Sequence, residues 1–200
     1  MLAQAIERAR ETDDYIGEAT FEGECLEDLN LSGLRIESVR LTNCTLSGCD
    51  MENIGLYDVE LKNCDLSNCK LGRSYWKNAR LTDCKALGSS FDRSSFKELS
   101  LTGGIFSYSN YVETFWENCT VKECDFKDAF FSEVRFKKVA LSKVNFSGVS
   151  FFKTALKNLD LSDCNIDGIA FSDTFSELRG AKVSALQAVD LAVRLGIKIV

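Results

Sequence analysis

Hydrophobic residues recur at every fifth position along most of the chain. The series begins at Phe21, continues through Leu26, Leu31 and Ile36, and ends at Phe171. All 31 of these positions, which we call the centre positions, are apolar or aromatic, and the register never slips. A second column, two residues before each centre position, holds mostly small or β-branched residues. The remaining three positions of each repeat are mainly polar.

A period of five fits neither an α-helix nor a β-strand. Five residues advance a helix by about 500°, so the centre positions would be spread around its axis. In a strand, an odd period would place successive centre positions on opposite faces. The chain can keep every centre position inward only by turning a corner in each repeat. The pattern therefore predicts a coil that stacks on the next coil.

The cysteines indicate how many repeats make one coil. Five of them are separated by multiples of twenty residues: Cys44, Cys64, Cys84, Cys124 and Cys164. Twenty residues are four repeats, so we predict a four-sided coil whose neighbours align side chains at about 4.8 Å. Eight of the nine cysteines, all but Cys25, stand in the small inward column. There we expect them to pack as small hydrophobic side chains.

Several segments resemble the A(D/N)LXX motif of the pentapeptide-repeat proteins. The closest are CDLSN at 64–68, CDFKD at 124–128, VNFSG at 144–148 and LDLSD at 159–163. The resemblance extends over residues 19–173 and implies a right-handed quadrilateral β-helix, in agreement with the coil predicted from the repeat.

We therefore predict an all-β solenoid with a short helix at each end. Residues 1–18 are expected to form an N-terminal capping segment, and residues 19–175 the β-helix. Residues 176–200 are expected to form a C-terminal capping and dimerisation helix with a tail. Near the N-terminus, the apolar residues from Leu2 to Ala9 lie on one helical stripe that could cover the first coil.

The C-terminal helix is apolar around most of its circumference. Ser184 is its expected N-cap and Gly196 its expected stop, and only Gln187, Asp190 and Arg194 form a polar stripe. Such a helix needs a partner beyond the end of the coil, so we expect a two-fold homodimer. The alternative is a monomer whose helix only caps the coil. The expected dimer contacts are Leu186, Val189, Val193 and Leu195.

The segment from Glu177 to Val200 resembles the C-terminal segment of the Qnr-type subfamily. Those proteins protect DNA gyrase and topoisomerase IV from quinolones, and their acidic, rod-shaped dimers are thought to resemble duplex DNA. The resemblance implies a DNA mimic that binds a type II topoisomerase and confers quinolone resistance. Some Qnr-type proteins have loops that interrupt the repeat and are needed for protection, whereas the register here is unbroken.

Composition narrows the classes of function. The chain has 200 residues, a net charge of −6, and neither histidine nor proline. Direct nucleic-acid binding is not expected, because it needs clustered Lys and Arg. The sequence shows no signal peptide and no long apolar segment, so we expect a cytoplasmic protein without membrane contact. No nucleophile has a candidate base, and no glycine-rich phosphate loop is present. We therefore do not expect the protein to be an enzyme or to bind a cofactor or a metal ion.

Counting modulo twenty sorts the outward residues onto four walls. The wall centred on Leu26 carries six acidic residues against two lysines, and we call it the acidic wall. Its candidate carboxylates are Glu27, Asp28, Asp65, Asp125, Asp128 and Asp167. The wall centred on Ile36 has seven basic and four acidic residues and three outward aromatic residues. We call it the docking wall, since an alternative function is a scaffold that binds an unknown protein through Tyr57, Tyr75 and Phe115.

Overall fold

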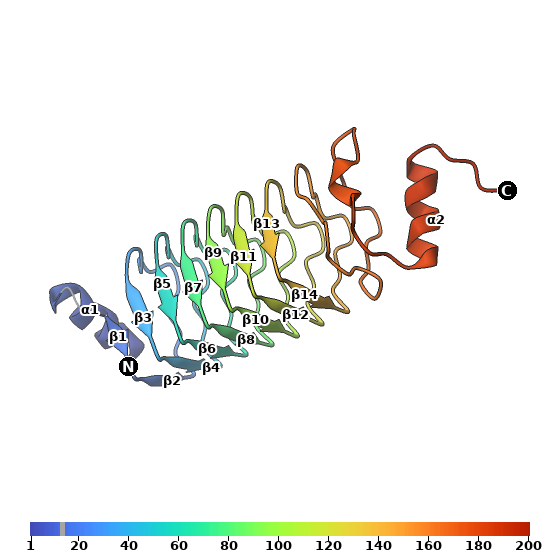
Figure 1. The fold of residues 1–200 in the computed structure, drawn as a ribbon. Helices are drawn as coiled ribbons and strands as arrows, with labels where there is room; N and C mark the ends of the chain where they lie inside the picture. The colour runs from blue at the N-terminus through green and yellow to red at the C-terminus, as the bar shows by residue number, and fades with distance from the viewer. Residues whose placement is uncertain (13–14) are drawn as a thin grey trace.

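The computed structural model describes residues 1–12 and 15–200 and is a four-sided β-solenoid (Figure 1). The coils stack along one axis, with helix α1 (Leu2–Thr12) at one end and helix α2 (Ala185–Arg194) at the other. The all-β solenoid predicted from the five-residue repeat is therefore confirmed, and so are its two terminal helices.

Two of the four walls are seven-stranded parallel sheets. The sheet of the docking wall consists of β1 (Ile16–Gly17), β3 (Arg35–Glu37), β5 (Gly55–Tyr57), β7 (Tyr75–Lys77), β9 (Ser95–Lys97), β11 (Phe115–Glu117) and β13 (Arg135–Lys137). The other sheet consists of β2 (Thr20–Glu22), β4 (Arg40–Thr42), β6 (Glu60–Lys62), β8 (Arg80–Thr82), β10 (Ser100–Thr102), β12 (Thr120–Lys122) and β14 (Ala140–Ser142).

The other two walls are joined by isolated parallel bridges rather than by strands. These bridges form two series, one starting with Cys25 and Thr45 and one with Asn30 and Asp50. In both series, as in both sheets, the paired residues are twenty positions apart. Four repeats therefore make one coil, as the cysteine spacing predicts.

The corners explain why a period of five keeps every centre position inward. The residue two positions after a centre position takes a left-handed backbone conformation in all coils but the last, where Asp163 and Asp173 do not; Asn43, Asn63 and Asp83 have φ values of 55°, 51° and 52°. This conformation is least costly for Gly, Asn and Asp. The corner N–H groups are also satisfied, since that of Asn43 donates to the next coil at 2.9 Å.

The interior is a continuous hydrophobic core. Every centre position is buried except four that are half-buried, Phe21, Phe136, Leu141 and Phe171. The large side chains of Trp76 and Trp116 are each 1% exposed and pack among the neighbouring phenylalanines.

Small side chains of the inward column donate hydrogen bonds to backbone carbonyls of the core. Eight cysteines are buried and Cys25 is exposed, as predicted. The thiol of Cys49 also donates a hydrogen bond to the carbonyl of Leu26, a centre residue of the preceding coil. Ser89 and Ser94 stand in the same column and make the equivalent bond from a hydroxyl. A small donor in this column therefore satisfies a core carbonyl as well as filling space.

The last coil is closed by a short 3₁₀ helix, η1 (Ser176–Leu178). Its Glu177 is buried, and its carboxylate accepts hydrogen bonds from the backbone N–H groups of Lys153 (2.9 Å) and Ser172 (3.2 Å). Burial alone would raise the pKa of Glu177. The hydrogen bonds outweigh burial, so the pKa lies below its ordinary value.

Candidate protein-interaction surfaces

The polar stripe of α2 faces the β-helix. The side-chain amide of Gln187 donates to the backbone carbonyls of Leu161 (2.9 Å) and Cys164 (2.7 Å) in the last coil. The guanidinium of Arg194 donates to the carbonyl of Ile169 at 2.5 Å. Gln187 also completes a capping box with Ser184, the predicted N-cap. The stripe thus fixes α2 across the end of the solenoid.

As a consequence, the predicted dimer contacts of α2 point away from the solenoid. Leu186 is 81% exposed, Val193 57%, Leu195 50% and Val189 43%. The tail beyond the helix also exposes Ile197 and Ile199. Among the described residues, nothing covers this apolar face.

The carboxylates of the acidic wall lie in separate groups. Glu27 and Asp28 are in the first coil, whereas the other predicted carboxylates are Asp65, Asp125, Asp128 and Asp167, further along the solenoid. Asp65 is bridged directly to Lys85 in the next coil, so a positive charge stands beside it. Carboxylate oxygens of this wall also accept local hydrogen bonds, as Asp125 does from the N–H of Lys127 at 2.8 Å.

Exposed hydrophobic residues separate these groups. Leu87 is 43% exposed and Ile105 42%, and Tyr108, at the edge of the wall, is 55% exposed. The acidic wall is thus a mixed surface, with apolar side chains in the middle and carboxylates on either side. Counting charges along the sequence did not bring out these three residues, although their outward positions follow from the same register.

The three aromatic residues of the docking wall are half-buried and lie in two groups. The rings of Tyr57 and Tyr75 are 5.5 Å apart, and the guanidinium of Arg35 lies 4.9 Å from the Tyr57 ring centre. Phe115 lies two coils beyond Tyr75 and is covered by Arg135 at 5.5 Å. Arginine stacking of this kind holds the rings in fixed orientations.

Several charges on the docking wall neutralise one another. Glu117 lies between Lys137 (2.5 Å) and Lys97 (3.6 Å), one from each neighbouring coil. The hydrogen bond from Lys137 lowers the pKa of Glu117, and the charge of Lys97 acts in the same direction. The excess of basic residues counted on this wall is therefore partly compensated at its centre.

Over residues 1–12 and 15–200, no group of three or more Cys, Asp or Glu residues is arranged to hold a metal ion. Burial raises the pKa of Cys69 to about 12 and that of Cys119 to about 11, so these thiols stay protonated at neutral pH. In the same part of the chain, no helix has the length and apolar character needed to cross a membrane.

The structure is a four-sided parallel β-solenoid, in which four five-residue repeats form each coil around a hydrophobic interior. Its outer walls and its two ends are the surfaces that a partner could contact. A family model, pentapeptide repeats in eight copies, matches residues 35–73, 60–97 and 131–168, together just over half of the chain. The chain belongs to the pentapeptide-repeat family.

Several solved structures are similar to this chain. Trypsin-treated QnrB1, a plasmid-mediated fluoroquinolone resistance protein, is 16% identical, with 93% of this chain and 99% of that chain covered and a TM-score of 0.44. HetL from the cyanobacterium Nostoc, involved in heterocyst differentiation regulation, is 14% identical over 88% and 92% of the two chains (TM-score 0.36). A pentapeptide-repeat protein from the thylakoid lumen of Arabidopsis thaliana is 16% identical over 64% and 68% (TM-score 0.31). No curated protein matches the chain.

Proposed function

We propose that the protein is a non-enzymatic homodimer that binds another protein along its β-helix. The observation that carries the proposed dimer is the orientation of α2. Its polar stripe is engaged with the last coil, while Leu186, Val189, Val193 and Leu195 are exposed. A second α2 placed by a two-fold axis would bury these side chains against their own counterparts.

Sedimentation at tens of micromolar protein tests the dimer. We expect a species of twice the chain mass of 22.3 kDa. The double substitution Leu186→Glu and Val193→Glu should give the monomer, because it places four carboxylates in the interface. Leu87→Glu is the control, since it changes another exposed apolar residue, 43% exposed, on a different surface. A 22 kDa species of the unsubstituted protein would contradict the dimer.

As the partner we propose a type II topoisomerase, DNA gyrase first, with protection from quinolones as the result. The support is the likeness of Glu177–Val200 to the Qnr-type tail, together with family membership. The carboxylates of the acidic wall would take the place of DNA phosphates, and the apolar residues between them would contact the enzyme directly. Such a partner would place the protein in the cytoplasm.

Gyrase supercoiling with and without a quinolone tests this partner. We expect the purified protein to alter supercoiling or to relieve quinolone inhibition. The pair Asp125→Asn and Asp128→Asn should weaken the effect, whereas Glu98→Gln with Glu113→Gln, exposed acids on other parts of the coils, should not. No effect at stoichiometric excess on gyrases from several bacteria would refute the proposal.

The second candidate function is a scaffold that docks a different protein on Tyr57, Tyr75 and Phe115. The stacking of Arg35 and Arg135 on these rings favours it, because aromatic side chains held in place lose little entropy on binding. Replacing all three residues by serine should abolish capture of the partner. Equal capture by the triple variant would exclude this wall as the docking site.

A further inference from the structure

The N-terminal end of the solenoid is only partly capped. β1 and β2 are the terminal strands of the two sheets, and within the described ranges no strand pairs with their outer edges. α1 covers part of this end with Leu2, Ile6 and Ala9, and Arg10 donates to the backbone carbonyl of Asn30 at 2.5 Å. Within the same ranges, no hydrogen bond joins α1 to the segment 20–25.

The second coil shows which backbone groups of the first coil are open. Arg40 donates its N–H to the first coil, and Thr42 accepts from it with its C=O. Thr20 and Glu22 occupy the same positions one coil earlier, so the N–H of Thr20 and the C=O of Glu22 point away from the molecule. Among the described residues, Cys25 is likewise bridged on one side, to Thr45. Among the described residues, nothing pairs with these groups, so the outer edge of β2 offers donors and acceptors in strand geometry.

Negative charge is concentrated at this same end. Residues 1–28 contain nine acidic residues and two basic ones, Arg8 and Arg10, and so sum to −7, whereas the whole chain has a net charge of −6. Glu18, Glu22, Glu27 and Asp28 are all exposed. A second copy meeting this end would bring the same four exposed carboxylates against them, so the charge favours a basic occupant.

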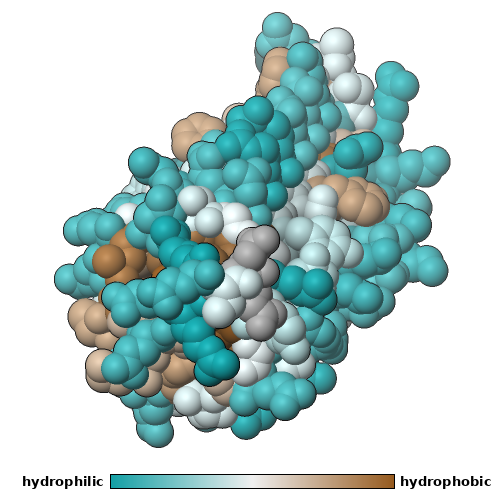
Figure 2. Space-filling model, turned by 90° about the vertical axis from the view of Figure 1, so that its left-hand side faces the viewer, coloured by the Kyte–Doolittle hydropathy of each residue, from teal (hydrophilic) through white to brown (hydrophobic). Residues whose placement is uncertain are grey.

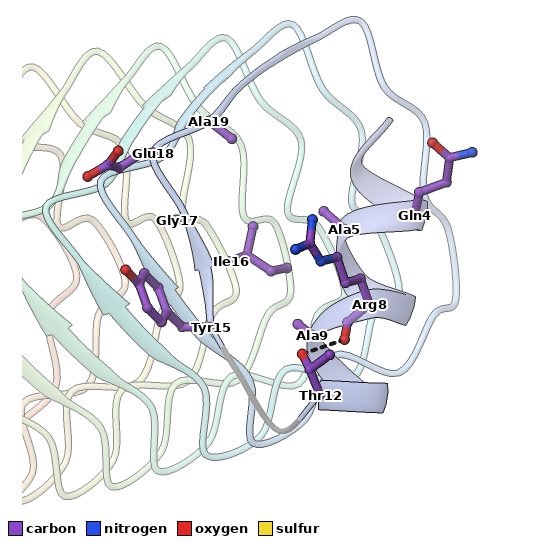
Figure 3. A pocket seen from close by; sticks show the side chains of 10 residues that line it. All are labelled: Gln4, Ala5, Arg8, Ala9, Thr12, Tyr15, Ile16, Gly17, Glu18 and Ala19. Atoms are coloured by element: carbon purple, nitrogen blue, oxygen red, sulfur yellow. Dashed lines mark hydrogen bonds between the residues drawn. The ribbon is translucent and has the colours of Figure 1, made fainter.

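Apolar surface is also accessible here. Phe21, the middle residue of β2, is half-buried, and Leu29 is 40% exposed. A groove of about 440 Å³ runs between α1 and the segment 16–19, with Ala5 and Ile16 lying between the two elements (Figure 3). Figure 2 looks onto this end and shows hydrophobic side chains between hydrophilic ones.

We propose that the outer edge of β2 binds an extended segment of a partner protein, with alternating basic and apolar residues, as an additional strand. An apolar residue would cover Phe21, and a basic residue would lie beside Glu22. The same sheet already contains this arrangement, because Arg40 and Glu60 of adjacent strands form an ion pair at 2.8 Å. Backbone pairing supplies affinity in strand addition, and the alternating side chains supply specificity.

The test uses a labelled, end-blocked heptapeptide Lys-Val-Lys-Val-Lys-Val-Lys, with Glu-Val-Glu-Val-Glu-Val-Glu as its acidic counterpart. Fluorescence anisotropy should detect binding of the basic peptide only. Thr20→Pro removes one outward N–H without touching the internal ladder and should weaken binding about tenfold, whereas Thr20→Val keeps the N–H and should bind normally. Glu18→Gln with Glu22→Gln should weaken binding about fivefold, and Glu98→Gln with Glu113→Gln should leave it unchanged.

Amide hydrogen exchange gives a readout that does not depend on whether the proline variant folds. Bound peptide should slow exchange at Thr20 and Cys25 of the unsubstituted protein. Absence of peptide binding would overturn the proposal. Binding that disappears with salt but is insensitive to Thr20→Pro and leaves these amides unprotected would also overturn it, because it would show attraction by charge alone.

Discussion

Replacing Ser74 by alanine tests how the β-helix accommodates a tryptophan in its interior. The indole N–H of Trp76 donates to the hydroxyl of Ser74 at 2.8 Å, and both side chains are buried. The Ser74 and Ser94 oxygens are 2.9 Å apart, and Ser94 donates to the carbonyl of Leu71 at 2.8 Å. Each hydroxyl has one proton, so the hydrogen bonds run in one direction, from the indole to the Leu71 carbonyl.

The magnitude follows from these partners. Ser74→Ala leaves a buried indole N–H without an acceptor, which costs about 1–3 kcal/mol, and removes the bond to Ser94, worth about 1 kcal/mol. We therefore expect the free energy of unfolding to fall by about 2–4 kcal/mol. In a Trp76→Phe background the indole N–H is absent, so Ser74→Ala should cost only about 1 kcal/mol. The double-mutant cycle should give a coupling energy of about 1–3 kcal/mol.

Urea unfolding followed by far-ultraviolet circular dichroism measures all four variants. Because a solenoid can unfold in segments, the free energies should be compared for the same transition, with equal slopes against urea. Two effects that simply add, with no coupling between Ser74 and Trp76, would refute the inferred chain of hydrogen bonds.

Three further predictions concern the core, the thiols and the C-terminal end. Leu66→Asp places a charge at a site that is 1% exposed and should cost about 4 kcal/mol or more, whereas Leu87→Asp, at a site 43% exposed, should change stability by about 0.5 kcal/mol or less; urea unfolding of the two variants compares them. A thiol reagent should modify only Cys25 rapidly in the folded protein and all nine cysteines after denaturation; a second rapid thiol would contradict the inward column. The depressed pKa of Glu177 contributes stability that is present above pH 4.5, its ordinary pKa, and is lost as the pH falls through the pKa of the folded state. Glu177→Gln should therefore reduce the slope of the unfolding free energy against pH in that acidic range. An unchanged slope would contradict this role of Glu177.

The sequence was sufficient to predict the coil, because the repeat is a local rule that every coil obeys. The centre residues follow from a fixed register, and the twenty-residue coil follows from the cysteines. The spacing does not predict the hydrogen bonds of the buried serines. Ser74 and Ser94 are small residues in a small-residue column, and nothing in the spacing says that an indole two residues away needs their oxygen.

The surfaces were harder to predict than the core. The polar stripe of α2 was visible in the sequence, but its direction depends on which carbonyls of the last coil need donors. Likewise, the net charge of the acidic wall takes no account of its uncharged side chains. Leu87 and Ile105 interrupt it, and only their exposure in the folded chain shows that the wall is mixed.

The two ends of the solenoid follow from one physical requirement. Within the stack, each coil satisfies the backbone of its neighbours, so unpaired backbone groups collect at the ends. At the C-terminal end, Gln187 and Arg194 donate to three carbonyls of the last coil, and this leaves the apolar face of α2 exposed. At the N-terminal end, no strand of the described part of the chain pairs with the outer edge of β2, and exposed carboxylates lie at the same end. Because α1 and α2 lie at opposite ends (Figure 1), a dimer formed through α2 would hold its two open edges far apart. The basic heptapeptide should then bind once per chain in the dimer, and with the same affinity in the monomeric Leu186→Glu and Val193→Glu variant; a loss of binding in that variant would show that the two ends are coupled.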